Sequence, residues 1–189
     1  MTVHLGKQLL LCLALLGGCA QRPPWANGRI VRERAPAHPV VQDFSHLAEQ
    51  VLAVHNRERA AVGTRPLAWD PALAAAAAAY GPALSRLGKL AHSAYSTRRG
   101  QGENLFMGTR GAYALDEMTA DWVAEKRLFK PGIFPKVSRN GHVEDVGHYT
   151  QMTWPGTARV GCAVYSDAKW DFFICRYAPP GNVPGTSLP

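Results

Sequence analysis

The feature that most restricts the fold of this chain lies near its C-terminus. It is the run Gly147-His148-Tyr149-Thr150-Gln151-Met152-Thr153-Trp154, followed by Gly161-Cys162 and then by Phe172-Phe173-Ile174-Cys175-Arg176-Tyr177. Helix or strand periodicity alone does not produce a mixed string of this length, so its risk of a chance match is far below that of a short motif. Segments 160–165 and 172–177 are short, apolar and rich in β-branched or aromatic residues, and they are joined by polar residues. This pattern predicts a β-hairpin.

The length and the cysteines indicate one exported domain. A chain of 189 residues with 47% hydrophobic residues has the size and composition of one globular domain with tails. Of its four cysteines, Cys12 and Cys19 lie in the N-terminal segment, which leaves Cys162 and Cys175 in the body of the domain. Two such cysteines in an exported chain predict one disulfide. A metal site is the weaker alternative, because the companion Cys-x-x-Cys pair is missing.

The N-terminus has the pattern of an export signal. Lys7 precedes the apolar stretch 9–16, which is too short to remain as a membrane span. The following Leu16-Gly17-Gly18-Cys19 resembles a bacterial lipobox, in which Cys19 is acylated and becomes the new N-terminus. The alternative is ordinary signal cleavage after Ala20, but a cysteine at this position has no other evident use. We therefore expect a signal peptide over 1–19 and a lipid-anchored envelope protein (periplasm or outer membrane), or otherwise a secreted one.

Composition divides the rest of the chain into three parts. Residues 20–42 are rich in proline and arginine and predict an extended tether, residues 43–182 form the folded domain, and residues 183–189 are expected to be a loose tail. Residues 1–19 hold one of the 21 Lys and Arg residues, so the remainder keeps 20 basic against 14 acidic residues, a net charge of +6. This charge favours anionic lipid or cell-wall partners. No aromatic-interleaved basic motif points to nucleic acid.

Three helices are expected before the hairpin. The first has Ser45 as a plausible cap, extends to Val62 and stops at Gly63. The second begins at Asp70-Pro71, which supplies a capping side chain and a first-turn proline. The third covers about 112–126 and places Glu125 on its apolar face, where a carboxylate needs a partner.

The C-terminal runs and Pro179-Pro180-Gly181-Asn182 resemble the signatures of the CAP superfamily, which comprises cysteine-rich secretory, antigen-five and class-one pathogenesis-related proteins and bacterial relatives. The resemblance implies an α+β fold, a three-layer α-β-α sandwich. It also implies a cavity tetrad of His92, Glu103, Glu125 and His148, with Glu103 eleven residues after His92. In that tetrad the two histidines bind a divalent metal such as Zn²⁺, while the glutamates orient them.

Each tetrad residue also has an ordinary structural interpretation. A single histidine is more often a satisfied surface or core group than a ligand. Glu103 could bind the backbone of its glycine-rich turn, and Glu125 could pair with Lys126 or Arg127. Asn104 is expected to fix the turn beside Glu103. His55, on the apolar face of the first helix, is expected to make a core hydrogen bond.

Residues 126–147 separate Glu125 from His148 by several residues more than in compact members of the family. Phe129 and Phe134 in this insertion are expected to form an apolar lip over the ligand groove, with Gln151 facing the cleft. A packed loop is the alternative.

Three functions compete. We favour a binding module for a lipid, sterol or cell-wall ligand. The second is a metal-dependent hydrolase with Glu103 or Glu125 as general base. It lacks support from any Gly-x-Ser-x-Gly elbow, His-Glu-x-x-His helix or active-site cysteine in the mature region. The third is an envelope interaction protein in which the tetrad is vestigial.

Overall fold

The computed structural model describes residues 30–34, 43–98 and 100–189, and its centre is a five-stranded sheet with the order β1-β3-β6-β5-β2. The strands are β1 (Ile30–Arg32), β2 (Ala68–Trp69), β3 (Gly102–Thr109), β5 (Arg159–Ser166) and β6 (Trp170–Ala178). Strands β3, β6 and β5 are antiparallel, whereas β1 and β2 pair in parallel with β3 and β5 at the two edges.

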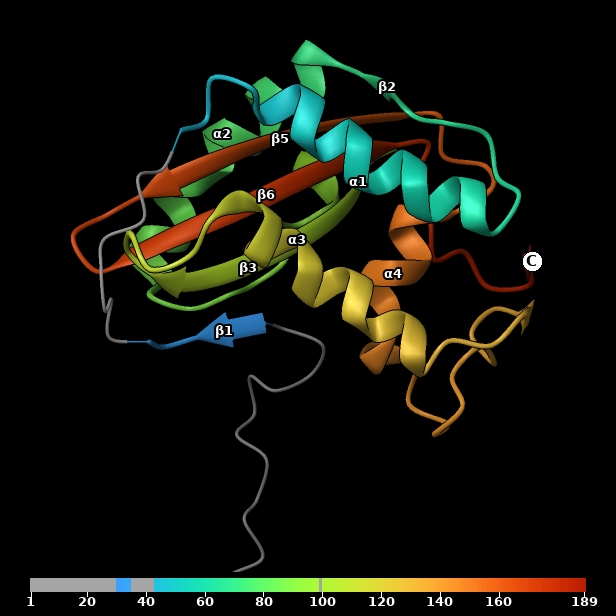
Figure 1. Cartoon of the computed structure of the whole chain (residues 1–189). Helices are drawn as coiled ribbons and strands as arrows, with labels where there is room; N and C mark the ends of the chain where they lie inside the picture. Colours follow the sequence, from blue (N-terminus) through green and yellow to red (C-terminus); the bar gives the residue numbers. More distant parts are fainter. Residues whose placement is uncertain (1–29, 35–42, 99) are drawn as a thin grey trace, which may run out of the picture.

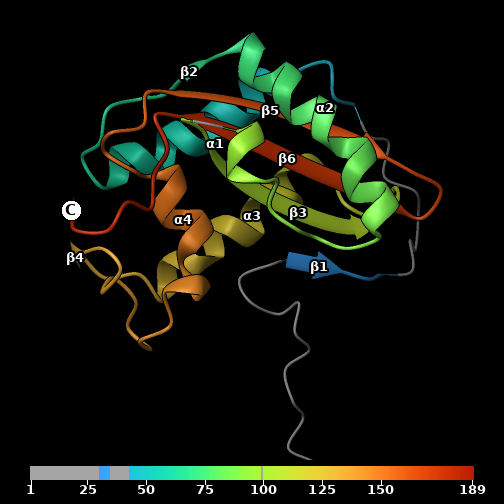
Figure 2. The ribbon, with the colours of Figure 1, turned by 180° about the vertical axis from the view of Figure 1, so that it is seen from behind.

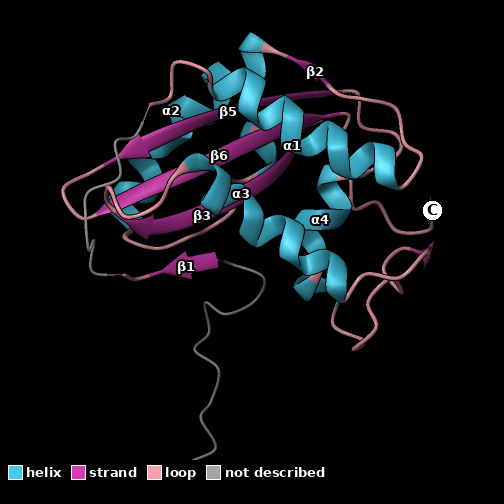
Figure 3. Ribbon diagram, viewed as in Figure 1, coloured by secondary structure: helices cyan, strands magenta, loops and turns pink. Residues whose placement is uncertain are grey.

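Helices cover both faces of this sheet. Figure 1 shows α1 (Leu47–Ala61), α3 (Leu115–Ala124) and α4 (Gly147–Met152) on one face, and Figure 2 shows α2 (Pro71–Leu87) on the other. Figure 3, coloured by secondary structure, shows the sheet between its two layers of helices. The α+β, three-layer α-β-α sandwich implied by the sequence is therefore confirmed.

The two layers of helices pack on alternate side chains of β6. Phe173, Cys175 and Tyr177 belong to the core beneath α1, α3 and α4, while Phe172 and Ile174 belong to the core beneath α2. All nine residues of β6 are buried. A strand buried on both faces reads as a continuous apolar run, which is why this segment was recognisable from the sequence.

Helix α2 begins where its sequence predicts, and a glycine ends it. The Asp70 carboxylate accepts hydrogen bonds from the backbone nitrogens of Ala72 (2.8 Å) and Leu73 (3.3 Å), and Gly88 ends the helix in the left-handed conformation. Its alanine-rich first turns lie very close to β5: a Cβ atom on Gly161 would stand 2.3 Å from the nitrogen of Ala74. A side chain at Gly161 would therefore push α2 off the sheet.

Two helix boundaries differ from expectation. The N-cap residue of α1 is His46 rather than Ser45, because the Ser45 backbone nitrogen donates to Asp43 Oδ1 (2.8 Å) in a local turn. Helix α3 ends at Ala124, and Glu125 begins a short 3₁₀ turn (Glu125–Arg127). Glu125 therefore lies just beyond the end of α3, and its side chain contacts the start of α4.

The tether and the tail are also more ordered than predicted. Ile30–Arg32 form β1 on the sheet edge, so this part of the 20–42 segment is docked on the domain. At the other end, β7 (Ser187–Leu188) pairs with β4 (Gly132–Ile133), and Leu188 is buried, so residues 183–189 are not a loose tail.

The predicted signal peptide with Cys19, the remainder of the tether over 20–29, and residues 35–42 lie outside the described residues. In the part of the chain that is described, no helix is long and apolar enough to cross a membrane.

Cys162 and Cys175 form the predicted disulfide. They stand directly opposite each other in the β5–β6 register and are both buried on the face toward α1 and α3. The bond closes a loop with a sequence separation of 13 residues and fastens the hairpin on which both cores are built.

Replacing both cysteines, in Cys162→Ala/Cys175→Ala, should lower the free energy of unfolding by about 2–3 kcal/mol, because the unfolded chain regains the freedom that a short closed loop denies it. Urea unfolding with and without a reductant measures this. The reductant should destabilise the unmodified protein and leave the double variant unchanged; an equal midpoint for the oxidised protein and the variant would contradict the prediction.

Candidate functional site

Glu103, the second residue of β3, organises the first half of the predicted tetrad. Its buried carboxylate accepts hydrogen bonds from His92 Nδ1 (2.7 Å) and from the backbone nitrogen (3.0 Å) and hydroxyl (3.1 Å) of Ser93. It also pairs with Nη2 of buried Arg176 (3.0 Å). Burial raises the pKa of Glu103, but the hydrogen bond from His92 and the charge of Arg176 outweigh burial and leave that pKa below its usual value. Glu103 is therefore an ionised anchor that fixes the His92 ring.

Glu125 performs the same task for His148. Its Oε2 atom accepts the backbone N–H groups of His148 (2.9 Å) and Tyr149 (3.0 Å), while Oε1 accepts from His148 Nδ1 (2.6 Å). The Trp122 ring stacks on the His148 ring with centroids 5.8 Å apart and an angle of 8° between the planes. Glu125 thus satisfies backbone N–H groups at the start of α4 that have no partner within the helix, and it orients His148. In the described structure it pairs with neither Lys126 nor Arg127.

The two histidines line one cavity of about 170 Å³, together with Glu103, Asn104, Glu144, Gly147 and Asn182. Since each Nδ1 donates to a glutamate, each Nε2 is left as the nitrogen able to accept a ligand, and within the described residues neither has a hydrogen-bond partner. The structure therefore brings together three tetrad residues at the cavity, with Glu125 behind His148. Among the described residues no group of three or more His, Cys, Asp or Glu is placed to hold a metal ion.

The side chains of Asn104 and Gln151 connect separate segments around the cavity through hydrogen bonds that the sequence did not predict. Asn104 does not serve the local turn; its amide donates to the carbonyl of His148 (3.1 Å) and to the Tyr177 hydroxyl (3.2 Å), which links β3 to α4. Gln151 lines a second cavity of about 390 Å³ beside His92, and its Oε1 accepts the backbone N–H of Gly181 (2.8 Å). That bond fixes the loop which forms the far wall.

The predicted apolar lip is not present. Phe129 packs against Tyr149 and Phe134 against Trp154, with ring centroids 5.5 and 5.6 Å apart, and both phenylalanines are more than nine-tenths buried. They belong to a third apolar cluster and do not line either cavity beside the histidines. The insertion is a packed loop, because its aromatic side chains find partners on α4 and the following turn.

Two buried polar residues of α1, His55 and Arg59, hold neighbouring segments of the domain by hydrogen bonds. His55 donates through Nδ1 to the Val51 carbonyl (2.7 Å) and accepts at Nε2 from the Tyr177 hydroxyl (2.9 Å), which confirms its core role. Arg59 is fully buried and donates to four carbonyls. These belong to Arg65, Met152, Trp154 and Thr157. Burial lowers the pKa of Arg59 to about 10. Sequence reasoning missed this role, since nothing local to Arg59 reveals carbonyls almost a hundred residues away.

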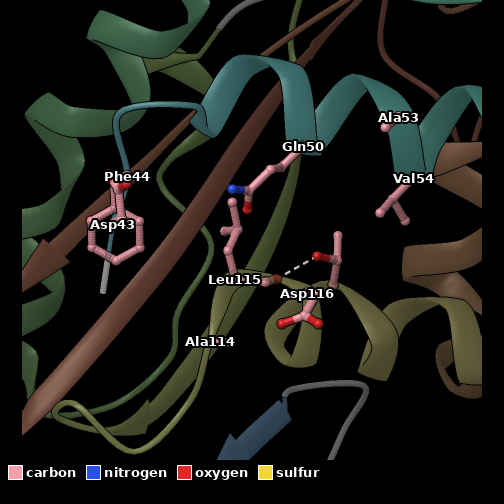
Figure 4. Close-up of a pocket in the computed structure, with 9 residues that line it drawn as sticks. Asp43, Phe44, Gln50, Ala53, Val54, Ala114, Leu115 and Asp116 are labelled. Atoms are coloured by element: carbon pink, nitrogen blue, oxygen red, sulfur yellow. Dashed lines mark hydrogen bonds between the residues drawn. The ribbon is translucent and has the colours of Figure 1, made fainter. Parts of the chain in front are cut away.

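A further pocket lies between α1 and α3, away from the tetrad (Figure 4). Its volume is about 490 Å³ and its lining residues are Asp43, Phe44, Gln50, Ala53, Val54, Ala114, Leu115, Asp116 and Thr119. Leu115 and Thr119 are buried in its floor, and the Thr119 hydroxyl is already bonded to the Leu115 carbonyl (2.5 Å). Exposed Asp43, Gln50 and Asp116 stand at its rim. Sequence reasoning did not find this pocket, because its two walls are far apart in the chain.

The three-layer α-β-α sandwich agrees with the comparisons with known proteins. The sequence model of CAP, the cysteine-rich secretory protein family, matches residues 52–177, so the chain belongs to this family. It is 38% identical over 138 residues to pathogenesis-related protein PR-1 of Medicago truncatula, covering 72% of this chain and 75% of the relative. It is 37% identical over 141 residues to pathogenesis-related protein 1C of Nicotiana tabacum, covering 74% and 79%. The crystal structure of NaASP2 with Zn²⁺ has the same fold, with a TM-score of 0.63 at 24% identity over 82% of this chain and 88% of the other.

The buried histidine predicts a loss of stability in mild acid. Burial lowers the pKa of His55 to about 4, below the value of about 6.5 for an unfolded histidine, so the unfolded chain binds more protons between these values. The free energy of unfolding should therefore fall by up to about 3 kcal/mol as the pH falls through this range. Urea unfolding at several pH values measures it. The variant His55→Gln should be less stable than the unmodified protein at pH 7, but its free energy of unfolding should fall less on acidification. A pH dependence identical to that of the unmodified protein would contradict the assignment to His55.

Proposed function

We propose that this protein is an exported binding module that holds an apolar-chain lipid in the pocket between α1 and α3. The observation that carries the proposal is the pocket itself: its volume of about 490 Å³ lies within the usual range for small-molecule sites, and its floor is apolar. Membership of the cysteine-rich secretory protein family and the predicted signal peptide both support export. We therefore propose a ligand groove on α1 and α3 in place of the one expected at Phe129 and Phe134, whose rings are packed against Tyr149 and Trp154.

The rim of the pocket indicates the kind of head group. Asp43 and Asp116 are exposed there, and no lining residue carries a positive charge. Hydrogen bonds from the side chain and backbone of Ser45 lower the pKa of Asp43, which keeps it ionised at neutral pH. Carboxylates at the mouth disfavour an anionic head group, so the ligand is an uncharged or cationic lipid, a class that includes sterols.

Binding is better supported than hydrolysis by the state of the two glutamates. Each carboxylate already accepts at least three hydrogen bonds from the protein, with donors on both of its oxygens. A general base needs a free lone pair within reach of the proton that it removes. Glu103 and Glu125 are instead committed to holding His92 and His148.

A second candidate function, which the oriented histidines favour, is binding of a divalent metal. His92 and His148 line the same small cavity and would supply two Nε2 ligands, with glutamates fixing both rings. Two imidazoles suit Zn²⁺, which would add a Lewis acid to the cavity when bound. With only two protein ligands, the remaining positions would belong to water or to a ligand.

Filling the pocket should weaken lipid binding. In Ala53→Phe an aromatic ring would enter the pocket from α1, and the affinity for the uncharged fluorescent methyl ester of cis-parinaric acid should fall at least about fivefold, because overpacking costs about 1–3 kcal/mol. The matched control is Ala60→Phe, an exposed alanine on the same helix that does not line the pocket. Fluorescence titration measures the affinities; equal binding by both variants would place the lipid elsewhere, and no binding by the unmodified protein would end the proposal.

The metal proposal has its own test. Calorimetric titration of the purified protein with Zn²⁺ should show binding in the micromolar range, and His92→Ala/His148→Ala should lose it. The control variant His46→Ala/His142→Ala removes two exposed histidines outside the cavity and should bind as the unmodified protein does. If the control loses binding and the tetrad variant keeps it, surface histidines bind the zinc, and the cavity has no metal role.

A further inference from the structure

The N-terminal segment 30–34 lies on the domain outside the residues that define the family, 52–177. Its strand β1 runs in parallel along the outer edge of β3, with Ile30 opposite Phe106 and Arg32 opposite Gly108. Figure 1 shows β1 at this edge, next to β3. Strand pairing of this kind covers hydrogen-bonding groups that an edge strand would otherwise expose.

Two arginines extend the contact from the sheet edge to α3. Arg32 donates to both oxygens of Asp121, through Nε (2.9 Å) and Nη2 (2.8 Å). Arg34 donates to both oxygens of Glu117 (3.1 and 3.2 Å) and to the Ala112 carbonyl. Its guanidinium carbon also lies 4.3 Å from the centroid of the Tyr113 ring. Paired donors of this geometry fix direction as well as distance.

The turn that Arg34 braces is one wall of the lipid pocket. Glu117 Oε2, which binds Arg34, also accepts the backbone N–H of Ala114 (2.9 Å) at the start of α3. Ala114, Leu115 and Asp116 line the pocket (Figure 4). The contacts therefore form a continuous series from Arg34 through Glu117 to the pocket wall.

We propose that Arg32 and Arg34 are positioning residues of the α1–α3 pocket: by docking segment 30–34 on β3 and α3, they hold the start of α3 in the position that admits the ligand. This inference rests on the proposed function for what enters the pocket, but the positioning itself is a property of α3. Fixing a wall in its binding conformation raises affinity by removing the cost of ordering it. Because both pairs are solvent-exposed, the effect is modest and sensitive to salt.

The test compares Arg32→Gln/Arg34→Gln with Arg159→Gln. Arg159 pairs with Asp70 (2.7 Å) near the opposite edge of the sheet. Its side chain is 56% exposed and that of Arg32 is 54% exposed, so Arg159 is a matched control from an ion pair that does not involve α3. Hydrogen exchange at the amides of residues 115–119 should become several-fold faster in the double variant only. The affinity for the methyl ester of cis-parinaric acid should fall about threefold to tenfold, as expected from the loss of two exposed ion pairs.

Salt and a conservative substitution separate positioning from a general loss of stability. Raising the salt from about 0.05 to about 0.5 M should weaken binding of the uncharged probe to the unmodified protein and leave the double variant unaffected, since only the unmodified protein has the Arg32–Asp121 and Arg34–Glu117 pairs to screen. Arg32→Lys/Arg34→Lys should restore part of the affinity, because the charge is kept but the paired donors are lost.

Unchanged exchange at 115–119 in the double variant would overturn the inference, as would an affinity loss of equal size in Arg159→Gln. If the unmodified protein does not bind the probe, the proposed lipid function is rejected. Faster exchange at 115–119 in the double variant would still support the positioning of α3.

Discussion

The burial of β6 on both faces is the constraint on which the rest of the structure depends. Its alternating side chains face two layers of helices, so neither core can form unless the strand is in register with β3 and β5. A slip of one residue would exchange the two sets of side chains between the layers. The Cys162–Cys175 bond fastens this register at its centre.

The same strand carries the polar groups that organise the histidine cavity. Arg176 faces the α2 side and pairs with Glu103, while the neighbouring Tyr177 faces the other side and bonds with His55 and Asn104. A buried ion pair contributes little net stability, and among the described residues two buried nitrogens of Arg176, Nε and Nη1, have no hydrogen-bond partner. Its evident effect is orientation: it keeps Glu103 ionised, and Glu103 fixes the ring of His92.

The molecule therefore has two separate cavities with different linings. The small polar cavity is built by residues whose bonds cross between β3, the end of α3 and α4, whereas the larger apolar pocket lies between α1 and α3. Helix α3 belongs to both, since its first turn lines the pocket and Trp122 and Glu125 at its end orient His148. Segment 30–34 contacts this helix, which connects the segment directly to one wall of the pocket between α1 and α3.

The family, the sandwich, the hairpin with its disulfide and the N-terminal cap of α2 were all predictable from the amino-acid sequence. These depend on local patterns or on a long motif: Asp70-Pro71 acts within a few residues, and β6 is recognisable as a largely apolar run. Tertiary structure alone decided the partners of Glu125, Asn104 and Arg59, the burial of Phe129 and Phe134, the docking of 30–34 and of Leu188, and the pocket between α1 and α3. Each of these depends on contacts between segments distant in the chain, and the type of residue does not reveal which distant group it will meet.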